Sequence, residues 1–185
     1  MTEFDINLFL YLNQLLAGSI ADLFFTGVTF LGNGLVLLLL VTPLMVLGSR
    51  DKFRAHFVAL VLSVALGGLL VHGIKFATES ERPPRYFASR GINIHIGTDI
   101  PATPSFPSGH AQTAFAVAVY LCLLYRKWTW TVPLLLAATA VGLSRIALGV
   151  HFPLDVLAGA LTGAGCAALG YRINGARLKK KSASC

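Results

Sequence analysis

Long apolar segments with few charges constrain this chain more than any other feature of its sequence. A helix needs ~20 predominantly apolar residues to cross a bilayer, and four segments fit this requirement: Ala55–Phe76, His110–Tyr125, Thr129–Leu148 and Phe152–Tyr171. Hydrophobic residues make up 55% of the 185 residues and charged residues only 12%, which is about half the charged fraction of an ordinary soluble domain. The pattern therefore predicts an all-α membrane protein, built as a polytopic bundle of transmembrane helices.

The N-terminal third is harder to divide into spans. The segment Leu35–Leu47 is short for a span, but apolar residues extend it backwards, and Ala21–Leu47 is too long for one straight helix. The tripeptide Gly-Asn-Gly at positions 32–34 predicts a break there. Residues 5–17 are apolar with polar interruptions, so they form either a first span or a helix that lies in the membrane interface. We expect five or six spans in all.

The cysteines and the N-terminus indicate neither a disulfide framework nor a cleavable leader. The three cysteines, Cys122, Cys166 and Cys185, lack the short spacings of a zinc site, and their odd number argues against paired bridges. The first residues include Glu3 and Asp5 and lack the basic region that begins a signal peptide. We therefore expect no signal peptide and no metal held by cysteine.

The positive charges separate into two groups if each apolar segment crosses the membrane once. Ten cations share one side: Arg50, Lys52, Arg54, Arg126, Lys127, Arg172, Arg177, Lys179, Lys180 and Lys181. Five fall on the other: Lys75, Arg82, Arg85, Arg90 and Arg145. The positive-inside rule predicts that the ten are cytoplasmic, which puts the five on the periplasmic or extracellular side. The net charge of +7 thus reflects topology rather than a nucleic acid partner, and cations retained on the outer side indicate an anionic ligand.

The outer side has two connections, residues 77–109 and 144–155, and the residue types needed to bind and cleave phosphate gather at their ends. They are Lys75, Arg82, Ser108, Gly109, His110, Arg145, His151 and Asp155. Arginine offers a planar bidentate fork to phosphate oxygens and lysine adds a point charge. A helix that starts near Ser108 presents free backbone N–H groups to an anion, and Gly109 allows close approach.

Two histidines in this set have the chemistry of phosphoryl transfer. His151 can act as a nucleophile if Asp155 orients its ring and stabilises its positive charge, and His110 can donate a proton to a leaving oxygen. Because Pro153 is tolerated only in the first turn of a helix, we expect His151 just before a helix and Asp155 inside its first turn.

Each residue has a structural alternative when it is taken alone. Lys75 could extend its amine from a helix end to the interface, Ser108 could be an ordinary N-cap, and His110 could be an interfacial residue. His151 and Asp155 could be a structural pair, because residues four apart face each other on a helix. The presence of all of them on one side of the membrane favours phosphate chemistry.

Three segments together resemble the signature of the type 2 phosphatidic acid phosphatase family, the integral-membrane lipid phosphate phosphatases. The first is Lys75, six residues and then Arg82-Pro83; the second is Pro-Ser-Gly-His at positions 107–110. The third is Ser144-Arg145, five residues, His151, three residues and Asp155. No signature position departs from the family pattern, and the resemblance covers about residues 75–155.

The resemblance implies a role for each signature residue. His151 would attack phosphorus and become phosphohistidine, Asp155 would orient it, and His110 would protonate the leaving group. The phosphoryl oxygens would be bound by Lys75, Arg82, Ser108, Gly109 and Arg145, which stabilise charge in the transition state. The family needs no metal or other cofactor. We thus expect one membrane-embedded phosphatase domain over residues 1–185, with N-terminal helices in 1–54, a catalytic helical core in 55–172 and a basic cytoplasmic tail in 173–185.

The resemblance leaves the substrate open. Undecaprenyl diphosphate suits an outward-facing site on a chain without an added domain, and phosphatidylglycerol phosphate, phosphatidic acid and a lipid A phosphate are alternatives. A glucose-6-phosphatase-like enzyme and the soluble vanadium haloperoxidases share the signature. A transporter or channel lined by cations is the non-enzymatic alternative, but an anion path has no need for a nucleophile supported by a carboxylate. In the long loop, Arg85, Arg90 and His95 either contact the headgroup or are solvated. The sequence does not indicate the oligomeric state.

Overall fold

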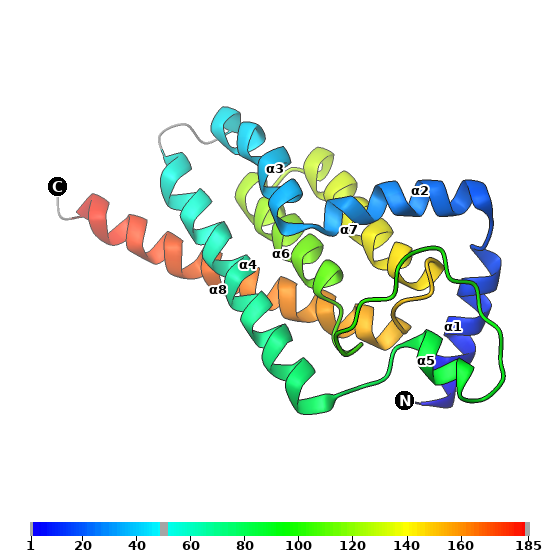
Figure 1. Cartoon of the computed structure of the whole chain (residues 1–185). Coiled ribbons are helices and arrows are strands. Elements are labelled where there is room, and N and C mark those ends of the chain that lie inside the picture. The colour runs from blue at the N-terminus through cyan, green and yellow to red at the C-terminus, as the bar shows by residue number, and fades with distance from the viewer. Residues whose placement is uncertain (1, 49–51, 184–185) are drawn as a thin grey trace.

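A computed structural model describes residues 2–48 and 52–183, so Arg50 and Cys185 lie outside the described residues. The elements in chain order are α1 (Glu3–Leu15), α2 (Ser19–Thr29), the 3-10 turn η1 (Phe30–Gly32), α3 (Gly34–Gly48), α4 (Phe53–Thr78), α5 (Pro83–Ala88), α6 (Gly109–Tyr125), α7 (Trp128–Ala147) and α8 (Pro153–Ala183) (Figure 1). No strand occurs among the described residues. The predicted all-α fold is confirmed.

Helix α6 is the centre of the bundle and packs against α4, α7 and α8. Two glycines of α8 bring it onto the backbone of α6 at close range. A Cβ atom on Gly159 would lie 2.2 Å from the carbonyl oxygen of Ser108, and one on Gly163 would lie 2.1 Å from the carbonyl oxygen of Gln112. Small residues four apart are a common way for membrane helices to approach closely. This packing fixes the start of α6, with Ser108, against the first turns of α8.

The expected count of five or six spans is not confirmed. Among the described residues, α4, α7 and α8 each belong to a helix long and apolar enough to cross a membrane, and α1 with α2 would add a fourth span only as a pair bent by 114°. Helices α3 and α6 are apolar but shorter than the ~20 residues of a full span. The break predicted at positions 32–34 is present, because η1 ends at Gly32 and the side chain of Asn33 accepts the N–H groups of Leu35 and Val36 at the start of α3.

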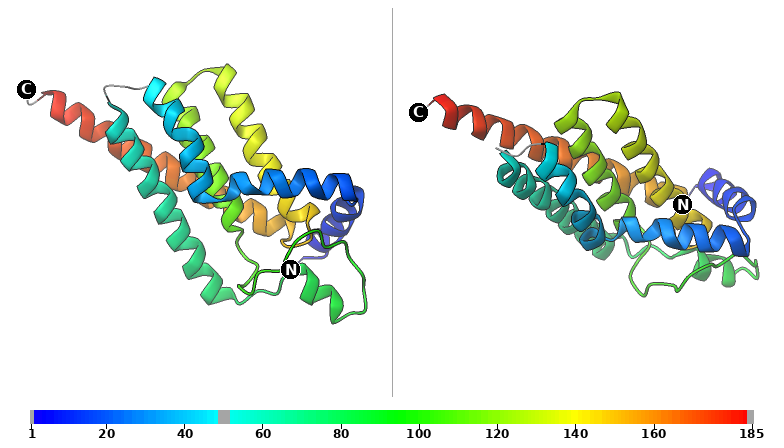
Figure 2. Two further views of the ribbon diagram at one scale, coloured as in Figure 1. Left: turned by 45° about the horizontal axis from the view of Figure 1, so that its top comes forward. Right: turned by 90° about the horizontal axis from the view of Figure 1, so that it is seen from above.

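The N-terminal helices cover the end of the bundle at which α7 passes into α8. Helix α1 contacts α7 and α8, and α2 lies along α7; Figure 2 shows both helices at this end, away from the C-terminus. An aromatic cluster joins α1 to α5 and to the connection between α7 and α8: Phe9 of α1 stacks on Phe87 of α5 at 5.5 Å and meets Phe152 at 5.2 Å. The residues expected to form a basic tail continue α8 as helix to Ala183.

Candidate active site

The His151–Asp155 pair is the centre of the site. His151 lies in the short connection between α7 and α8, and Asp155 lies in the first turn of α8, as Pro153 predicted. The Nδ1 atom of His151 is 3.3 Å from Oδ2 of Asp155, and both residues are buried, with 3% and 5% exposure. The same Oδ2 atom accepts the backbone N–H of Phe152 at 2.9 Å and the hydroxyl of Ser105 at 2.5 Å. The carboxylate is therefore held by three donors, one of which is the imidazole.

The second ring nitrogen of His151, Nε2, lies against Arg82. Nη1 of Arg82 is 3.3 Å from Nε2 of His151 and donates to the carbonyl oxygen of Val150 at 2.8 Å. A guanidinium only donates hydrogen bonds, so this contact requires an unprotonated Nε2 and assigns the ring proton to Nδ1, beside Asp155. Burial lowers the pKa of His151 well below its ordinary value, and the attraction of Asp155 offsets only part of that effect. The ring is accordingly neutral, with the lone pair of Nε2 available as a nucleophile.

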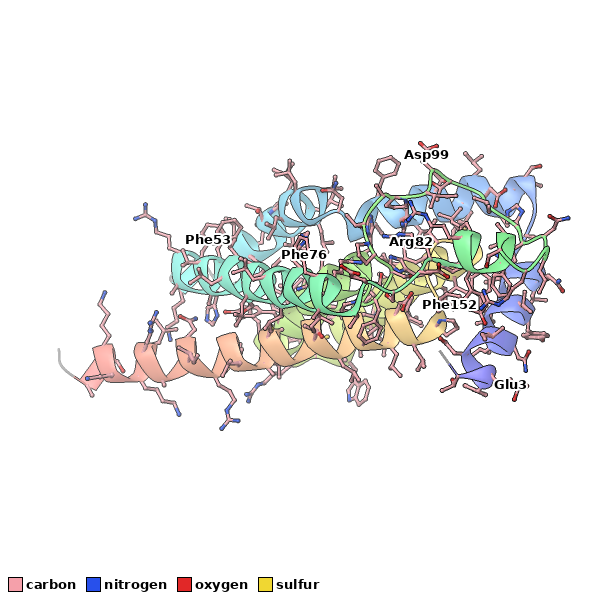
Figure 3. The ribbon with its side chains drawn as sticks, turned by 60° about the horizontal axis from the view of Figure 1, so that its bottom comes forward. Glu3, Phe53, Phe76, Arg82, Asp99 and Phe152 are labelled. Atoms are coloured by element: carbon pink, nitrogen blue, oxygen red, sulfur yellow. The ribbon has the colours of Figure 1, made fainter. Side chains whose placement is uncertain are left out.

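Lys75 and Arg82 also hold the end of the long loop. The Nζ atom of Lys75, near the end of α4, donates to the carbonyl oxygens of Pro104 and Ser105, the latter at 3.0 Å. Nε of Arg82 donates to the carbonyl oxygen of Thr103 at 2.8 Å. Figure 3 shows Arg82 and Phe152 toward the same end of the molecule, far from Phe53 at the start of α4. The two cations thus fix the loop segment that delivers Ser105 to Asp155.

Two buried donors near this pair have no hydrogen-bond partner among the described residues: the hydroxyl of Ser108 and Nε of Arg145. Ser108 precedes α6 at the N-cap position, yet its side chain makes no capping hydrogen bond, so the ordinary N-cap alternative does not describe it. Nη1 of Arg145, in the last turn of α7, donates to the hydroxyl of Thr29 of α2 at 2.7 Å. The positive charge of Arg145 contributes to the lowered pKa of His151. Leaving a buried polar group unsatisfied costs about 1–3 kcal/mol, and an anion at this place would satisfy both groups.

Gly109 and His110 form the first turn of α6. Burial lowers the pKa of the His110 ring, and the positive charges of Arg145 and Arg82 lower it further. The ring packs against Gly32, where a Cβ atom would be only 2.6 Å from Cδ2 of His110. The glycine of the predicted break therefore makes room for the histidine as well as ending η1.

These observations can be set beside known proteins. Residues 56–179 match the PAP2 superfamily. The chain belongs to the PAP2 superfamily. It is 33% identical over 134 residues to an undecaprenyl-diphosphatase of Sulfolobus acidocaldarius, which covers 72% of this chain and 61% of that protein. The chain thus spans about three fifths of the length of this relative.

Two crystal structures share the PAP2 fold with the chain. LpxE of Aquifex aeolicus superposes with a TM-score of 0.77 and 30% identity over 92% of this chain and 96% of LpxE. A transmembrane PAP2-type phosphatidylglycerolphosphate phosphatase of Bacillus subtilis superposes with a TM-score of 0.73 over 94% and 87%, at 23% identity.

Several residues of this PAP2 site were not identified from the sequence. Ser105 is fully buried and bridges Asp155 and His151, with its hydroxyl also 3.3 Å from Nδ1. Its only sequence signal was its place two residues before Pro107. Thr29 and Thr103, the side-chain partners of Arg145 and Arg82, carried none.

Two polar residues of α1 support the site from outside. Asp5 accepts the backbone N–H of Leu154 at 2.9 Å, which satisfies a free donor at the start of α8. The side chain of Asn13 donates to the carbonyl oxygens of Ile146 and Ala147 at the end of α7. Both side chains are buried, so the polar interruptions of the N-terminal segment brace the connection that carries His151.

The remaining charged residues of the long loop lie outside this centre. Nε2 of His95 lies 2.7 Å from Asp22 of α2, and its backbone N–H and carbonyl groups both bind Asn13. Arg90 stacks over the ring of Tyr86 at 3.7 Å and is exposed, as is Arg85. His95 therefore anchors the loop to α1 and α2. No group of three or more His, Cys, Asp or Glu side chains in metal-binding proximity occurs within residues 2–48 and 52–183.

Proposed function

We propose that this PAP2 chain is a membrane phosphatase that hydrolyses a lipid phosphate or diphosphate through a phosphohistidine on Nε2 of His151. The observation that carries the proposal is the position of His151, with Nδ1 3.3 Å from Asp155 and Nε2 3.3 Å from Arg82, which assigns the ring proton to Nδ1. Nε2 is then unprotonated, which is the state that a histidine nucleophile needs, and its neighbour Arg82 is a donor that can also bind phosphoryl oxygens.

In the first step, Nε2 forms a bond to phosphorus while the bond from phosphorus to the leaving oxygen breaks. His110 supplies the proton that the leaving oxygen takes up. Burial and the charges of Arg145 and Arg82 lower the pKa of its ring in the free chain, and the bound phosphate anion favours the protonated form. Asp155 stabilises the positive charge that the imidazole of His151 gains. The phosphoryl oxygens are received by Nε of Arg145 and the hydroxyl of Ser108, which have no hydrogen-bond partner among the described residues, and by Arg82 and the start of α6. Lys75 contributes charge and holds the loop.

In the second step, a water molecule attacks phosphorus and the P–N bond breaks. His110, now neutral, accepts the proton of that water, and inorganic phosphate leaves. Both steps use only side chains of the chain itself, because the cationic donors perform the charge neutralisation that a metal ion would otherwise supply.

Within this activity we favour undecaprenyl diphosphate as substrate, which the name of the Sulfolobus relative supports. Phosphatidylglycerol phosphate, phosphatidic acid and a lipid A phosphate are the alternatives. The long outer loop packs over the site through Thr103 and Ser105, so substrate choice depends on this loop and the neighbouring α5, where Arg85 is exposed.

The test is phosphate release by the purified full-length chain in detergent from each of the four lipids, with and without EDTA. The proposal expects turnover of at least one lipid in EDTA, inhibition by vanadate, and loss of turnover in His151→Ala. His72→Ala, an exposed histidine of α4, is the matched control. An acid-labile phosphoryl group should be trapped on the wild-type chain only. If no lipid releases phosphate, the anion transporter becomes the better explanation.

We also propose that the site faces the periplasm or the extracellular space and that the C-terminus is cytoplasmic, from the division of ten and five cations. In a chain whose native cysteines are replaced by serine, Asp99→Cys should react with an impermeant maleimide on intact cells. Lys180→Cys should react only after permeabilisation. The reverse pattern would place the active site inside.

A further inference from the structure

A cleft of about 580 Å³ lies between α4 and α8, away from the candidate active site. Its volume is within the range of ligand pockets. It runs along α4 from Arg54 to Leu66 and along α8 from Cys166 to Lys181. Lys75 lies near the other end of α4, about 30 Å from Arg54 at 1.5 Å per residue; Phe53 and Phe76 in Figure 3 mark these two ends. The cleft is therefore separate from the phosphate chemistry.

The walls of this cleft are apolar and open to the outside of the bundle. The two helices meet at Gly170 of α8, where a Cβ atom would lie 2.0 Å from the hydroxyl oxygen of Ser63 of α4. Large side chains line the cleft on either side and are all exposed by more than a third: Val58, Leu62, Leu66, Leu169 and Ile173. In a membrane this surface faces acyl chains rather than water.

Positive charge is concentrated at one end of the cleft. Arg54, Arg177 and Lys181 line that end, and the described lining includes no aspartate or glutamate. Arg54 and Arg177 are exposed and form no ion pair with a described carboxylate. The cleft thus joins an apolar channel to a cationic mouth at the end of α4 that lies away from the active site.

We propose that this cleft is a non-catalytic binding site for an anionic phospholipid. An acyl chain lies along the apolar channel, and the phosphate of the headgroup binds between Arg54 and Arg177. Basic pockets between membrane helices bind anionic headgroups in this way, and the arginine fork matches the geometry of phosphate. The proposal does not depend on the proposed hydrolysis, because the cleft shares no residue with the candidate active site.

The test is native mass spectrometry of the detergent-purified full chain with dioleoyl phosphatidylglycerol or dioleoyl phosphatidylcholine. The phosphate of phosphatidylglycerol is a diester, so it carries no terminal phosphoryl group for His151 to remove. The wild type should bind phosphatidylglycerol more tightly than phosphatidylcholine. Arg54→Gln with Arg177→Gln should weaken phosphatidylglycerol binding by about 30-fold, roughly fivefold for each lost cation. Phosphatidylcholine binding should weaken much less, because its choline cation already offsets the charge of its phosphate.

Matched variants separate this site from general charge effects and from the active site. Lys179→Gln with Lys180→Gln removes two exposed cations of α8 that do not line the cleft, and it should not weaken binding. His151→Ala should bind phosphatidylglycerol like the wild type, whereas Leu62→Trp, which fills the channel, should weaken both lipids. Unchanged binding in the double arginine variant, or equal loss in the double lysine variant, would overturn the proposal. So would a dimer that the cleft substitutions dissociate, because a second copy would then be the occupant.

Discussion

Arg82 and His151 are joined by a contact of 3.3 Å between Nη1 and Nε2. Arg82 therefore has a second role beside the phosphate binding that we propose for it. It selects the histidine tautomer in which Nε2 is unprotonated, and it marks the position that a phosphoryl group would take when Nε2 attacks. At the other ring nitrogen, Asp155 accepts a hydrogen bond from Nδ1–H. His151 thus lies between a cation at Nε2 and an anion at Nδ1.

Asp155→Asn removes the negative charge and keeps the shape of the side chain. We expect kcat to fall by about 10³–10⁴-fold with little change in KM, because the amide no longer stabilises the charged ring in the transition state. Steady-state kinetics on the best lipid substrate measure this. Asp22→Asn is the control, since Asp22 pairs with His95 outside the site. A kcat near that of the wild type in Asp155→Asn would remove Asp155 from the mechanism.

Ser105 is a positioning residue, because its hydroxyl binds Asp155 and lies beside Nδ1 of His151. Hydrogen bonds to charged groups contribute about 1.5–3 kcal/mol, so Ser105→Ala should lower kcat by about 10–100-fold. KM should be unchanged, because Ser105 does not face the substrate. The exposed Ser89→Ala serves as the comparison, and a rise in KM alone would show that Ser105 binds substrate instead.

Ser108→Ala should affect stability and ligand affinity in opposite directions. Its buried hydroxyl has no hydrogen-bond partner within the described part of the chain, so its removal should leave the apparent Tm unchanged or raise the unfolding free energy by about 1 kcal/mol. Without that donor, inhibition by vanadate should weaken about tenfold. Ser63→Ala, in which a buried hydroxyl does have a partner, should not be stabilised. A Ser108→Ala chain that is less stable yet binds vanadate normally would indicate a structural serine.

His110→Ala separates proton donation from phosphate binding. The alkoxide that leaves a phosphate monoester has a conjugate acid with a pKa near that of water, about 16, whereas a lipid phosphate leaving from a diphosphate has a second pKa of about 6. Acid catalysis typically contributes ~10²–10⁴-fold, so the variant should lose far more single-turnover rate on phosphatidic acid than on undecaprenyl diphosphate. Equal proportional losses would show that His110 acts through its contact with phosphate.

Gly163→Ala tests the packing that holds the site. The new Cβ atom would lie 2.1 Å from the carbonyl oxygen of Gln112, a backbone atom that cannot rotate away as a side chain can. We expect a loss of about 1–3 kcal/mol of stability, read as a lower apparent Tm in detergent. Gly165→Ala, two residues further along the same helix, meets nothing within 4 Å and should be neutral. Equal Tm values for the two variants would contradict the close α6–α8 contact.

The sequence by itself determined the helical class, the positions of the central helices and the break before α3. Apolar composition and helix-breaking residues act locally, so they can be read along the chain. It also determined the place of His151 and Asp155 at the start of α8, because Pro153 restricts the helix at that point. The family signature supplied the remaining site residues as a set, without their contacts.

Only the tertiary structure decided how those residues are connected. Ser105 and Asp155 are 50 positions apart, and Asp5 reaches Leu154 across 149; no local pattern specifies such pairs, which depend on how the helices pack. The same holds for Gly32, whose missing side chain accommodates His110. The number of spans also depended on the fold, because hydropathy measures how apolar a segment is and not whether it is straight. The bend of 114° between α1 and α2 and the short lengths of α3 and α6 leave three candidate spans among the described residues, or four if the bent pair is one span.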